Sequence, residues 1–508
     1  MRTRLILIWM SILWFGAGPV QADPSAFEVL TQAGTVRGAP LGDGTVVFRG
    51  LPFAQPPVGA LRWRPPQPVA AWSGVRSATS KAANCPQTRY GAWNADEATR
   101  GREDCLYLDV RTPSLTPTAR LPVMVWIHGG GNRGGSMGDT VLSSLGRRGV
   151  VLVAIQYRLA ALGFMSHPAL SAETPGRTSG NYGLMDQIAA LHWVHDNIAQ
   201  FGGDPANVTL FGESAGAQDV GLMMLTDGSR GLFQKAIEES GTASFGLTSR
   251  SLAQSERVGE TVAILAGAPP RASAPQLRDL PVSALLAAGE AAQVDGLDDS
   301  SFIWLQAVVD GHVLKRAPSE ILKAGRQQRL PLIIGSNARE LNLHGDDVRG
   351  VVRRLYGVHA PAALRLYGLD GDALPAADPR LGDVATQVAD DVTFRCPSGA
   401  VAAAQAGVGA PVWRYQYDVT PKTGVVTHGS ELAAVMGEAP VSAPGVRPTF
   451  SLQEYWAAFA RFGDPNQTGL SAWPRFSAKK QAYLAFEDGG PRIDAQLRAP
   501  FCRLLTNF

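Results

Sequence analysis

Short, continuous apolar runs alternate with amphipathic stretches along the chain. Two of the runs, LPVMVWIHGGG at Leu121–Gly131 and VVLVAIQYR at Val150–Arg158, are rich in Val and Ile. Strands that are buried on both faces of a mainly parallel sheet have this composition. The stretch Leu184–Gly202 has apolar residues at helical spacing and ends at a glycine, so it predicts a crossover helix before the next strand, NVTLF. The alternation predicts an α/β fold.

The organisation of the chain follows from the same pattern, because no repeat, low-complexity tract or charged linker interrupts it. We therefore expect one large domain over residues 23–508. Insertions between Ser240 and Ser300 and between Leu341 and Phe394 would form a helical cover over a pocket. The Ala- and Leu-rich segment Ser251–Val294 fits that role.

The first 22 residues have the pattern of a secretory signal peptide. Arg2 and Arg4 precede an apolar run from Leu5 to Phe15, and a small residue, Ala22, stands where cleavage is expected. The run is much shorter than the ~20 residues that a membrane span needs. The sequence therefore predicts export to the periplasm or the extracellular space, with no stable membrane span.

The net charge of the chain indicates which kinds of partner it does not attract. The formal net charge is +2, and removing Arg2 and Arg4 with the leader brings it close to zero. A neutral chain has no electrostatic attraction to nucleic acid or to an anionic membrane. Small molecules are the expected partners, and the sequence leaves the oligomeric state open.

Four cysteines in an exported chain indicate disulfides, although four cysteines allow three pairings. Their spacing suggests Cys85 with Cys105 and Cys396 with Cys502. The first bridge would close a short loop and add about 3 kcal/mol in the chain-entropy model. A metal site is disfavoured, because no CxxC pair or histidine cluster accompanies these cysteines.

The segment VTLFGESAGA at Val208–Ala217 places Ser214 between two glycines directly after a predicted strand. A nucleophile on a sharp strand-to-helix turn has a strained backbone, and side chains two residues before and after it would collide. Gly212 and Gly216 remove that collision. The serine hydroxyl would then stand above the sheet edge, where the next helix begins with free backbone N–H groups.

A serine nucleophile needs a base to take its proton and donors to stabilise the oxyanion that forms. The glycine cluster HGGGNRGG follows a predicted strand, and Gly130, Gly131 and the N–H of Ala215 are the expected oxyanion hole. Of the eight histidines, His428 in a polar turn is the candidate base. Glu340, just beyond the predicted strand LPLIIGSNARE, is the candidate acid in the chain order serine, acid, histidine.

Several longer motifs follow one another along the chain. They are FRGLPFAQPPVGALRWRPPQP (Phe48–Pro68), EDCLYLDV (Glu103–Val110), FGGDPANVTLFGESAGA (Phe201–Ala217), FARFGDPN (Phe459–Asn466) and WPRF (Trp473–Phe476). In these motifs the chain resembles the type B carboxylesterases, the cholinesterase-like branch of the α/β-hydrolases, over nearly all of its mature length. The resemblance implies a mainly parallel central sheet flanked by helices.

The resemblance also implies a triad of serine, glutamate and histidine, which falls on Ser214, Glu340 and His428. It implies the two disulfides that the spacing suggests. Glu213 stands directly before the serine, as in the family, and Ser240 in EESGTA is either a supporting residue behind the triad or a plain turn serine.

The family tends to have an acidic residue before the catalytic glutamate and a glycine after it, where this chain has Arg339 and Leu341. This departure leaves Asp346 and Asp347 as alternative acids.

The expected activity is hydrolysis of a small carboxylic ester through an acyl-enzyme, with no metal or organic cofactor. Trp93 could receive a cationic group or act as a plain aromatic wall, and Phe245 could line the acyl side. Two alternatives stay open: a non-catalytic binding protein with a cholinesterase-like fold, and an amidase or peptidase on the same fold.

Overall fold

The computed structural model describes residues 24–297, 307–342, 344–345, 347–421, 424–437 and 451–505. Its centre is an eleven-stranded sheet. In spatial order the strands are β16 (Gly490–Ala495), β15 (Ala482–Glu487), β14 (Val412–Asp418), β13 (Leu332–Asn337), β10 (Lys235–Glu239), β9 (Gly203–Glu213), β7 (Leu121–Ile127), β8 (Val151–Ile155), β6 (Tyr107–Thr112), β4 (Val46–Pro52) and β3 (Ala39–Pro40).

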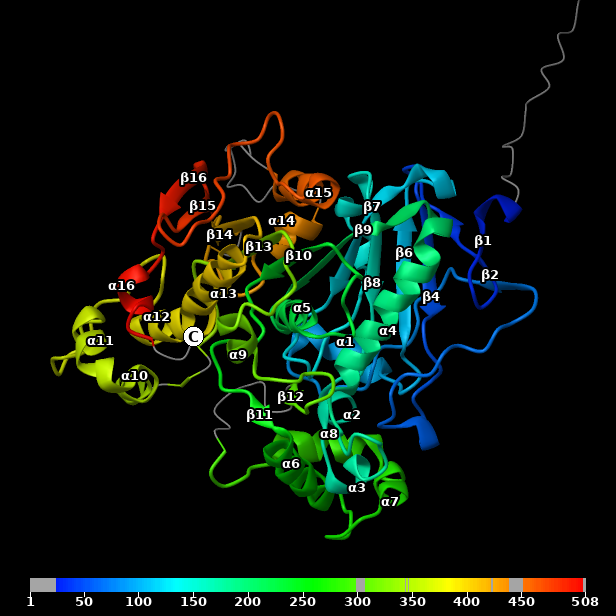
Figure 1. The fold of residues 1–508 in the computed structure, drawn as a ribbon, viewed down its shortest axis with the longest axis horizontal. Coiled ribbons are helices and arrows are strands. Elements are labelled where there is room, and N and C mark those ends of the chain that lie inside the picture. Colours follow the sequence, from blue (N-terminus) through cyan, green and yellow to red (C-terminus); the bar gives the residue numbers. More distant parts are fainter. Residues whose placement is uncertain are drawn as a thin grey trace, which may run out of the picture.

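The middle of this sheet is parallel from β8 through β7, β9, β10, β13 and β14 to β15, and the edge strands pair antiparallel. The predicted α/β architecture with a mainly parallel sheet is confirmed (Figure 1). Two small sheets lie outside it. They consist of β1 (Glu28–Leu30), β2 (Thr35–Arg37) and β5 (Val75–Ser77), and of β11 (Arg250–Ser251) and β12 (Val308–Val309).

The α-helices lie between and after the strands along the chain, singly or in runs of two to four. They are α1 (Ala95–Arg100), α2 (Ala160–Phe164), α3 (Pro168–Ser171), α4 (Tyr182–Asn197), α5 (Ala215–Leu225), α6 (Leu252–Leu265), α7 (Ala274–Arg278), α8 (Val282–Ala291), α9 (Pro318–Lys323), α10 (Val348–Tyr356), α11 (Ala360–Leu366), α12 (Val384–Asp390), α13 (Cys396–Gly407), α14 (Leu432–Met436), α15 (Leu452–Phe462) and α16 (Ala499–Cys502). A π-helical turn, Asp391–Arg395, joins α12 to α13.

Short 3-10 turns complete the secondary structure. They are η1 (Pro24–Phe27), η2 (Gly59–Leu61), η3 (Ala92–Asn94), η4 (Pro117–Ala119), η5 (Thr140–Leu142), η6 (Ser144–Arg147), η7 (Ile198–Phe201) and η8 (Gly357–His359). The predicted crossover helix is thus α4 followed by η7, since the last turn before Gly202 tightens.

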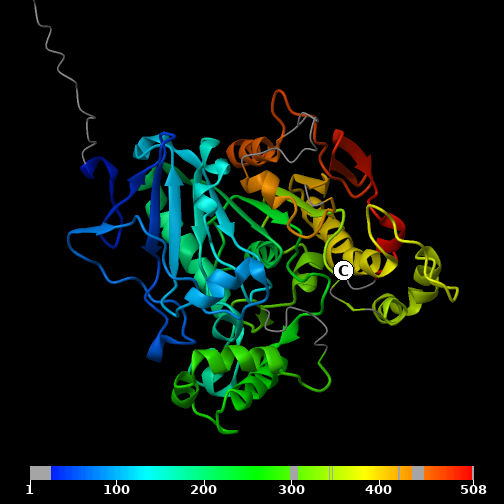
Figure 2. The same cartoon turned by 180° about the vertical axis from the view of Figure 1, so that it is seen from behind.

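Helices cover both faces of the central sheet (Figures 1 and 2). On one face, Leu191 of α4 and Val220 of α5 pack in the same cluster as the inward side chains of β7 and β9. On the other face, Trp456 and Phe459 of α15 pack against Trp126 and its neighbours. The strands are therefore buried on both sides, which explains why their sequences are continuous apolar runs rather than alternating ones.

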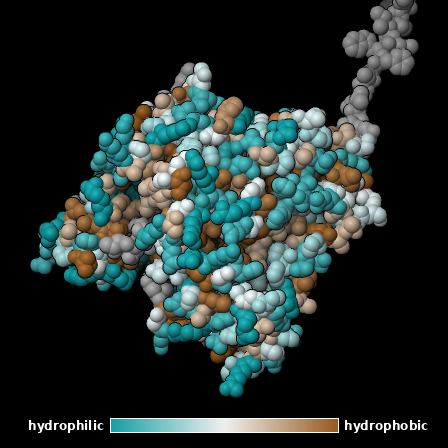
Figure 3. Space-filling model, in the orientation of Figure 1, coloured by the Kyte–Doolittle hydropathy of each residue, from teal (hydrophilic) through white to brown (hydrophobic). Residues whose placement is uncertain are grey.

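The two insertions expected to be helical contain helices. The first holds α6, α7 and α8, which gather beside α2 and α3 at one end of the molecule (Figures 1 and 2). The second holds α10, α11 and α12, which share a small apolar core of their own with residues of the C-terminal segment. The face of the molecule drawn in Figure 3 carries apolar residues scattered among polar ones.

Both expected disulfides are present, joining Cys85 to Cys105 and Cys396 to Cys502. The predicted signal peptide, residues 1–22, lies outside the described residues. Within the described ranges, no helix has the length and apolarity to cross a membrane.

Candidate active site

Ser214 lies between the end of β9 and the start of α5, at a turn with φ +57° and ψ −123°. This backbone conformation is strained for a residue with a side chain. A Cβ atom on Gly216 would lie 2.1 Å from the carbonyl oxygen of Ile127, and one on Gly212 would lie 2.6 Å from the carbonyl carbon of Gly216. The expected need for glycine on both sides of the serine is confirmed.

Three side chains from separate loops form a hydrogen-bonded chain at this turn. Oγ of Ser214 lies 2.8 Å from Nε2 of His428, and Nδ1 of the same ring lies 2.7 Å from Oε2 of Glu340. The Glu340 side chain is fully buried, whereas 14% of the His428 side chain is exposed. Glu340 follows β13 and His428 follows β14, so adjacent parallel strands bring the acid and the base to one edge of the sheet.

Hydrogen bonds hold both the side chain and the backbone of Glu340. Its Oε1 accepts a hydrogen bond from the backbone N–H of Asn337 at 2.7 Å, and its own N–H donates to Asp390 at 3.1 Å. The alternative acid Asp347 instead caps α10, since its Oδ1 accepts from the N–H of Gly350 at 2.9 Å. The other alternative, Asp346, lies outside the described residues.

The glycine loop after β7 lies against the nucleophile. A Cβ atom on Gly129 would be 3.1 Å from Cβ of Ser214, which shows how closely the two backbones approach. Gly130 and Gly131 have φ values of +104° and +66°, a region that glycine adopts at little cost. Ala215 is the first residue of α5, so its N–H has no partner within the helix.

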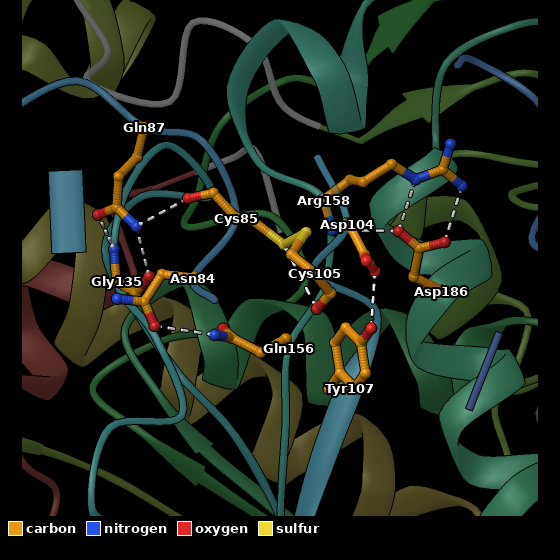
Figure 4. The surroundings of a disulfide bond; sticks show 10 residues. All are labelled: Asn84, Cys85, Gln87, Asp104, Cys105, Tyr107, Gly135, Gln156, Arg158 and Asp186. Carbon is orange, nitrogen blue, oxygen red and sulfur yellow. Dashed lines mark hydrogen bonds and ion pairs between the residues drawn. A yellow bond between two sulfur atoms is a disulfide. The ribbon is translucent and has the colours of Figure 1, made fainter. Parts of the chain in front are cut away.

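The disulfide loop Cys85–Cys105 holds the far end of the glycine loop. Gln87, two residues from Cys85, donates to the carbonyl oxygen of Gly135 and accepts from its N–H, both at 2.8 Å (Figure 4). Asn94 donates to the same Gln87 oxygen at 3.0 Å. The amide of Gln87 therefore pairs with Gly135 in the way that two neighbouring strands pair.

Carboxylates surround the imidazole of His428 on more than one side. Oε1 of Glu213 lies 3.1 Å from Nε2 of His428. Buried Glu431, whose charge also acts on His428, accepts from Nδ2 of Asn337 at 2.5 Å and from Oγ of Ser240 at 3.2 Å. Ser240 thus contacts a buried carboxyl group rather than a member of the hydrogen-bonded chain.

Burial and mutual repulsion raise the pKa values of the carboxyl groups of Glu213 and Glu431. Burial raises the pKa of Glu213 to about 7, and the charge of His428 counteracts part of this shift. Burial also raises the pKa of Glu431 to about 8, with repulsion from Glu213 and Glu340 adding to it. For His428, burial lowers the pKa, but the charge of Glu213 and the hydrogen bond and charge of Glu340 outweigh burial and raise the pKa above 6.5.

Aromatic residues lie on one side of the imidazole. The ring of Phe394 is centred 5.3 Å from that of His428, and Phe245 meets Phe394 edge to face at 5.7 Å. Trp93 is 58% exposed and lies near the glycine loop, where a Cβ atom on Gly134 would be 3.2 Å from its ring. Within the described ranges, no group of three His, Cys, Asp or Glu side chains has the arrangement of a metal site.

The sequence profile of the carboxylesterase family matches residues 25–350 and 371–505. The chain belongs to the carboxylesterase family. A fumonisin B1 esterase of Sphingopyxis macrogoltabida is 35% identical over 505 residues, which cover 93% of this chain and 89% of the relative. Liver carboxylesterase 1 of Oryctolagus cuniculus is 36% identical over 492 residues, which cover 86% of this chain and 85% of the relative.

Solved structures agree with this assignment. A carboxylesterase of Geobacillus stearothermophilus superimposes with a TM-score of 0.79 at 30% identity, covering 94% of this chain and 100% of that one. This carboxylesterase therefore has the α/β-hydrolase fold and is a carboxylic-ester hydrolase, as the sequence predicts. Residues 351–370, which the family profile leaves unmatched, hold α11 and most of α10.

Proposed function

We propose that this carboxylesterase cleaves its esters through an acyl-enzyme on Ser214, with His428 as the base and Glu340 as the acid that orients it. The observation that carries the proposal is the unbroken chain of hydrogen bonds from Ser214 Oγ through both ring nitrogens of His428 to Glu340. Among the described residues, Glu340 is the acid whose carboxylate contacts Nδ1, whereas the carboxylate of Asp347 caps α10.

In the acylation step, His428 takes the hydroxyl proton as Ser214 Oγ attacks the ester carbonyl carbon. Glu340 holds the ring in the tautomer with the proton on Nδ1 and stabilises the imidazolium that forms. The N–H groups of Gly130, Gly131 and Ala215 donate to the developing oxyanion. Collapse of the tetrahedral intermediate releases the alcohol, which leaves with the proton held by His428.

In the deacylation step, His428 takes a proton from water, which attacks the acyl carbon. The second tetrahedral intermediate uses the same donors and releases the carboxylic acid, and the proton returns to Ser214. Glu213 supports both steps, because its negative charge near Nε2 stabilises the imidazolium. Ser240 acts further away, through Glu431 and Asn337.

We further propose that residues 1–22 are a cleaved signal peptide and that residues 23–508 form one catalytic domain, exported to the periplasm or beyond. Two disulfides support this proposal, since disulfides persist in oxidising compartments. The partner is a small-molecule ester.

The test is hydrolysis of p-nitrophenyl acetate by the oxidised mature chain. We expect Ser214→Ala to lower kcat roughly 10⁴-fold or more, because the nucleophile is lost. Ser229→Ala is the matched control, since Ser229 is equally buried but donates to the carbonyl oxygen of Met223, and it should keep full turnover.

Turnover that persists in folded Ser214→Ala would contradict the proposal, as would a folded wild type that hydrolyses no ester. A matched p-nitroanilide separates the amidase alternative, which predicts anilide cleavage that Ser214→Ala abolishes, whereas an esterase leaves the anilide uncleaved.

A further inference from the structure

Asn132 directly follows the three consecutive glycines of the glycine loop, is wholly buried and has φ +55°. Its Nδ2 donates to Oδ1 of Asp219 at 3.0 Å, and its carbonyl oxygen accepts from the N–H of Ala160 at 2.8 Å. A buried amide with these partners has one defined position. The residue directly after Gly131 is therefore fixed by both its side chain and its backbone.

Asp219 belongs to α5, the helix that begins directly after Ser214. It is wholly buried, and its second oxygen accepts from Nε2 of Gln187 on α4 at 2.5 Å. Burial raises the pKa of this carboxyl group to about 7, whereas the two amide donors favour its ionised form. The Asn132–Asp219 hydrogen bond thus joins the glycine loop to the helix that begins directly after the nucleophile.

Tyr157 holds the other end of the same loop. Its hydroxyl lies 2.8 Å from the carbonyl oxygen of His128 and 3.0 Å from Oδ1 of Asn132, so its proton can be donated to either. Its ring also stacks on that of His128 at 4.5 Å. The three glycines Gly129–Gly131 consequently lie between two anchored residues, which limits the backbone freedom that glycine otherwise has.

From this arrangement we propose that Asn132 and Asp219 are positioning residues for the oxyanion hole. They set the distance between the N–H groups of Gly130 and Gly131 and the nucleophile Ser214, which directly precedes α5. The inference rests on the proposed function, in which those N–H groups stabilise the oxyanion. A small displacement of these N–H donors lowers the reaction rate strongly, because they stabilise the transition state only at the position where negative charge develops.

The experiment compares Asn132→Leu with Asn181→Leu. Asn181 is a matched control, because it is also wholly buried, has φ +57° and makes two hydrogen bonds through its side chain, here to the backbone of Val308. Each variant is assayed on p-nitrophenyl acetate and for inhibition by a trifluoromethyl ketone, which forms a tetrahedral adduct with a serine nucleophile. Thermal unfolding gives the stability of each.

We expect both variants to lose stability but only Asn132→Leu to lose catalysis. Its kcat should fall about 10- to 100-fold with KM nearly unchanged, and the inhibition constant of the ketone should rise by a similar factor. A folded Asn132→Leu with wild-type kcat and wild-type inhibition would overturn the inference while leaving the proposed function intact. Inactivity of the wild type itself would instead overturn the proposed function.

Exchanging the partners provides a second test that does not depend on Asn132→Leu folding. In Asn132→Asp combined with Asp219→Asn, the new carboxylate accepts from Tyr157 and from residue 219, and the new amide oxygen accepts from Gln187. We expect Asn132→Asp alone to lose activity, because two carboxylates then face each other, and the double variant to recover at least half of the lost kcat. A double variant no more active than Asn132→Asp would overturn the inference.

Discussion

At the scale of single residues, two carboxylates contact the imidazole of His428, although one carboxylate is enough to orient the ring. Glu340 contacts Nδ1 and Glu213 lies near Nε2, the nitrogen that faces Ser214. Both carboxylates favour the protonated ring, so the proposed base becomes neutral only above its ordinary pKa. Activity should therefore rise with pH through a midpoint above 6.5.

Glu213→Gln should move that midpoint to lower pH. Removing the charge lowers the pKa of His428, and the neutral base then persists at more acidic pH. We expect a shift of about one pH unit or more, given the energy of two charges at this separation. The measurement is kcat/KM between pH 5 and 10, with Glu487→Gln, a partly exposed carboxylate paired with Arg492, as the matched control. An unmoved midpoint in Glu213→Gln would show that Glu213 does not act on the charge of His428.

The sequence predicts the role of a residue when neighbouring residues in the chain determine it. It does not predict contacts between residues that are distant in the chain. Gly212 and Gly216 flank Ser214 directly, so their role follows from the turn itself. Glu431 contacts Asn337 across 94 residues of sequence, and nothing in either segment alone indicates that contact. Its one local signal is its place three residues after His428, which brings it to the same turn.

At the scale of elements, hydrophobic runs predict β7, β8, β9 and β13, because those strands are buried on both faces. The central strands β10 and β14 carry charged residues and are not predicted. The edge strands β3, β4 and β16 lack that signal, since each is short, bulged or partly exposed, and they were not predicted. Glu340 could be proposed as the acid because β13 has a clear apolar run and Glu340 follows it. Its fixed position, by contrast, depends on α12 and the π-helical turn, which no periodicity predicts.

The two disulfides should stabilise the fold unequally. Cys396 and Cys502 are 106 residues apart, whereas Cys85 and Cys105 are 20 apart. In the chain-entropy model, a loop of about 100 residues contributes about 4.7 kcal/mol and a short loop about 3 kcal/mol. We expect replacement of the Cys396–Cys502 pair by alanines to lower the free energy of unfolding more than replacement of Cys85 and Cys105. Denaturant unfolding of both double variants measures this, and the reverse order would contradict the loop-length argument.

At the scale of the whole molecule, buried acids far from solvent should govern how stability depends on pH. Glu238 lies on β10 in the middle of the sheet, is 1% exposed, and neither of its oxygens has a hydrogen-bond partner among the described residues. Burial raises its pKa from 4.5 to about 8. Between these values the folded protein binds a proton that the unfolded chain has lost, so stability falls as pH rises.

Glu238→Gln should remove this contribution. The wild type should lose up to about 1.4 kcal/mol of unfolding free energy, relative to the variant, for each pH unit between about pH 5 and 8. Urea unfolding at several pH values measures the difference, and Glu487→Gln serves as the partly exposed control. Parallel pH profiles for the wild type and Glu238→Gln would mean that Glu238 stays ionised in the folded protein.

The strained backbone conformation of Ser214 affects which substitutions evolution favours at this position. At φ +57° and ψ −123°, glycine would fold at lower cost than serine does. Drift toward greater stability therefore favours loss of the side chain at this turn, and only selection for chemistry opposes it. A descendant freed from that selection would be expected to lose its serine here early.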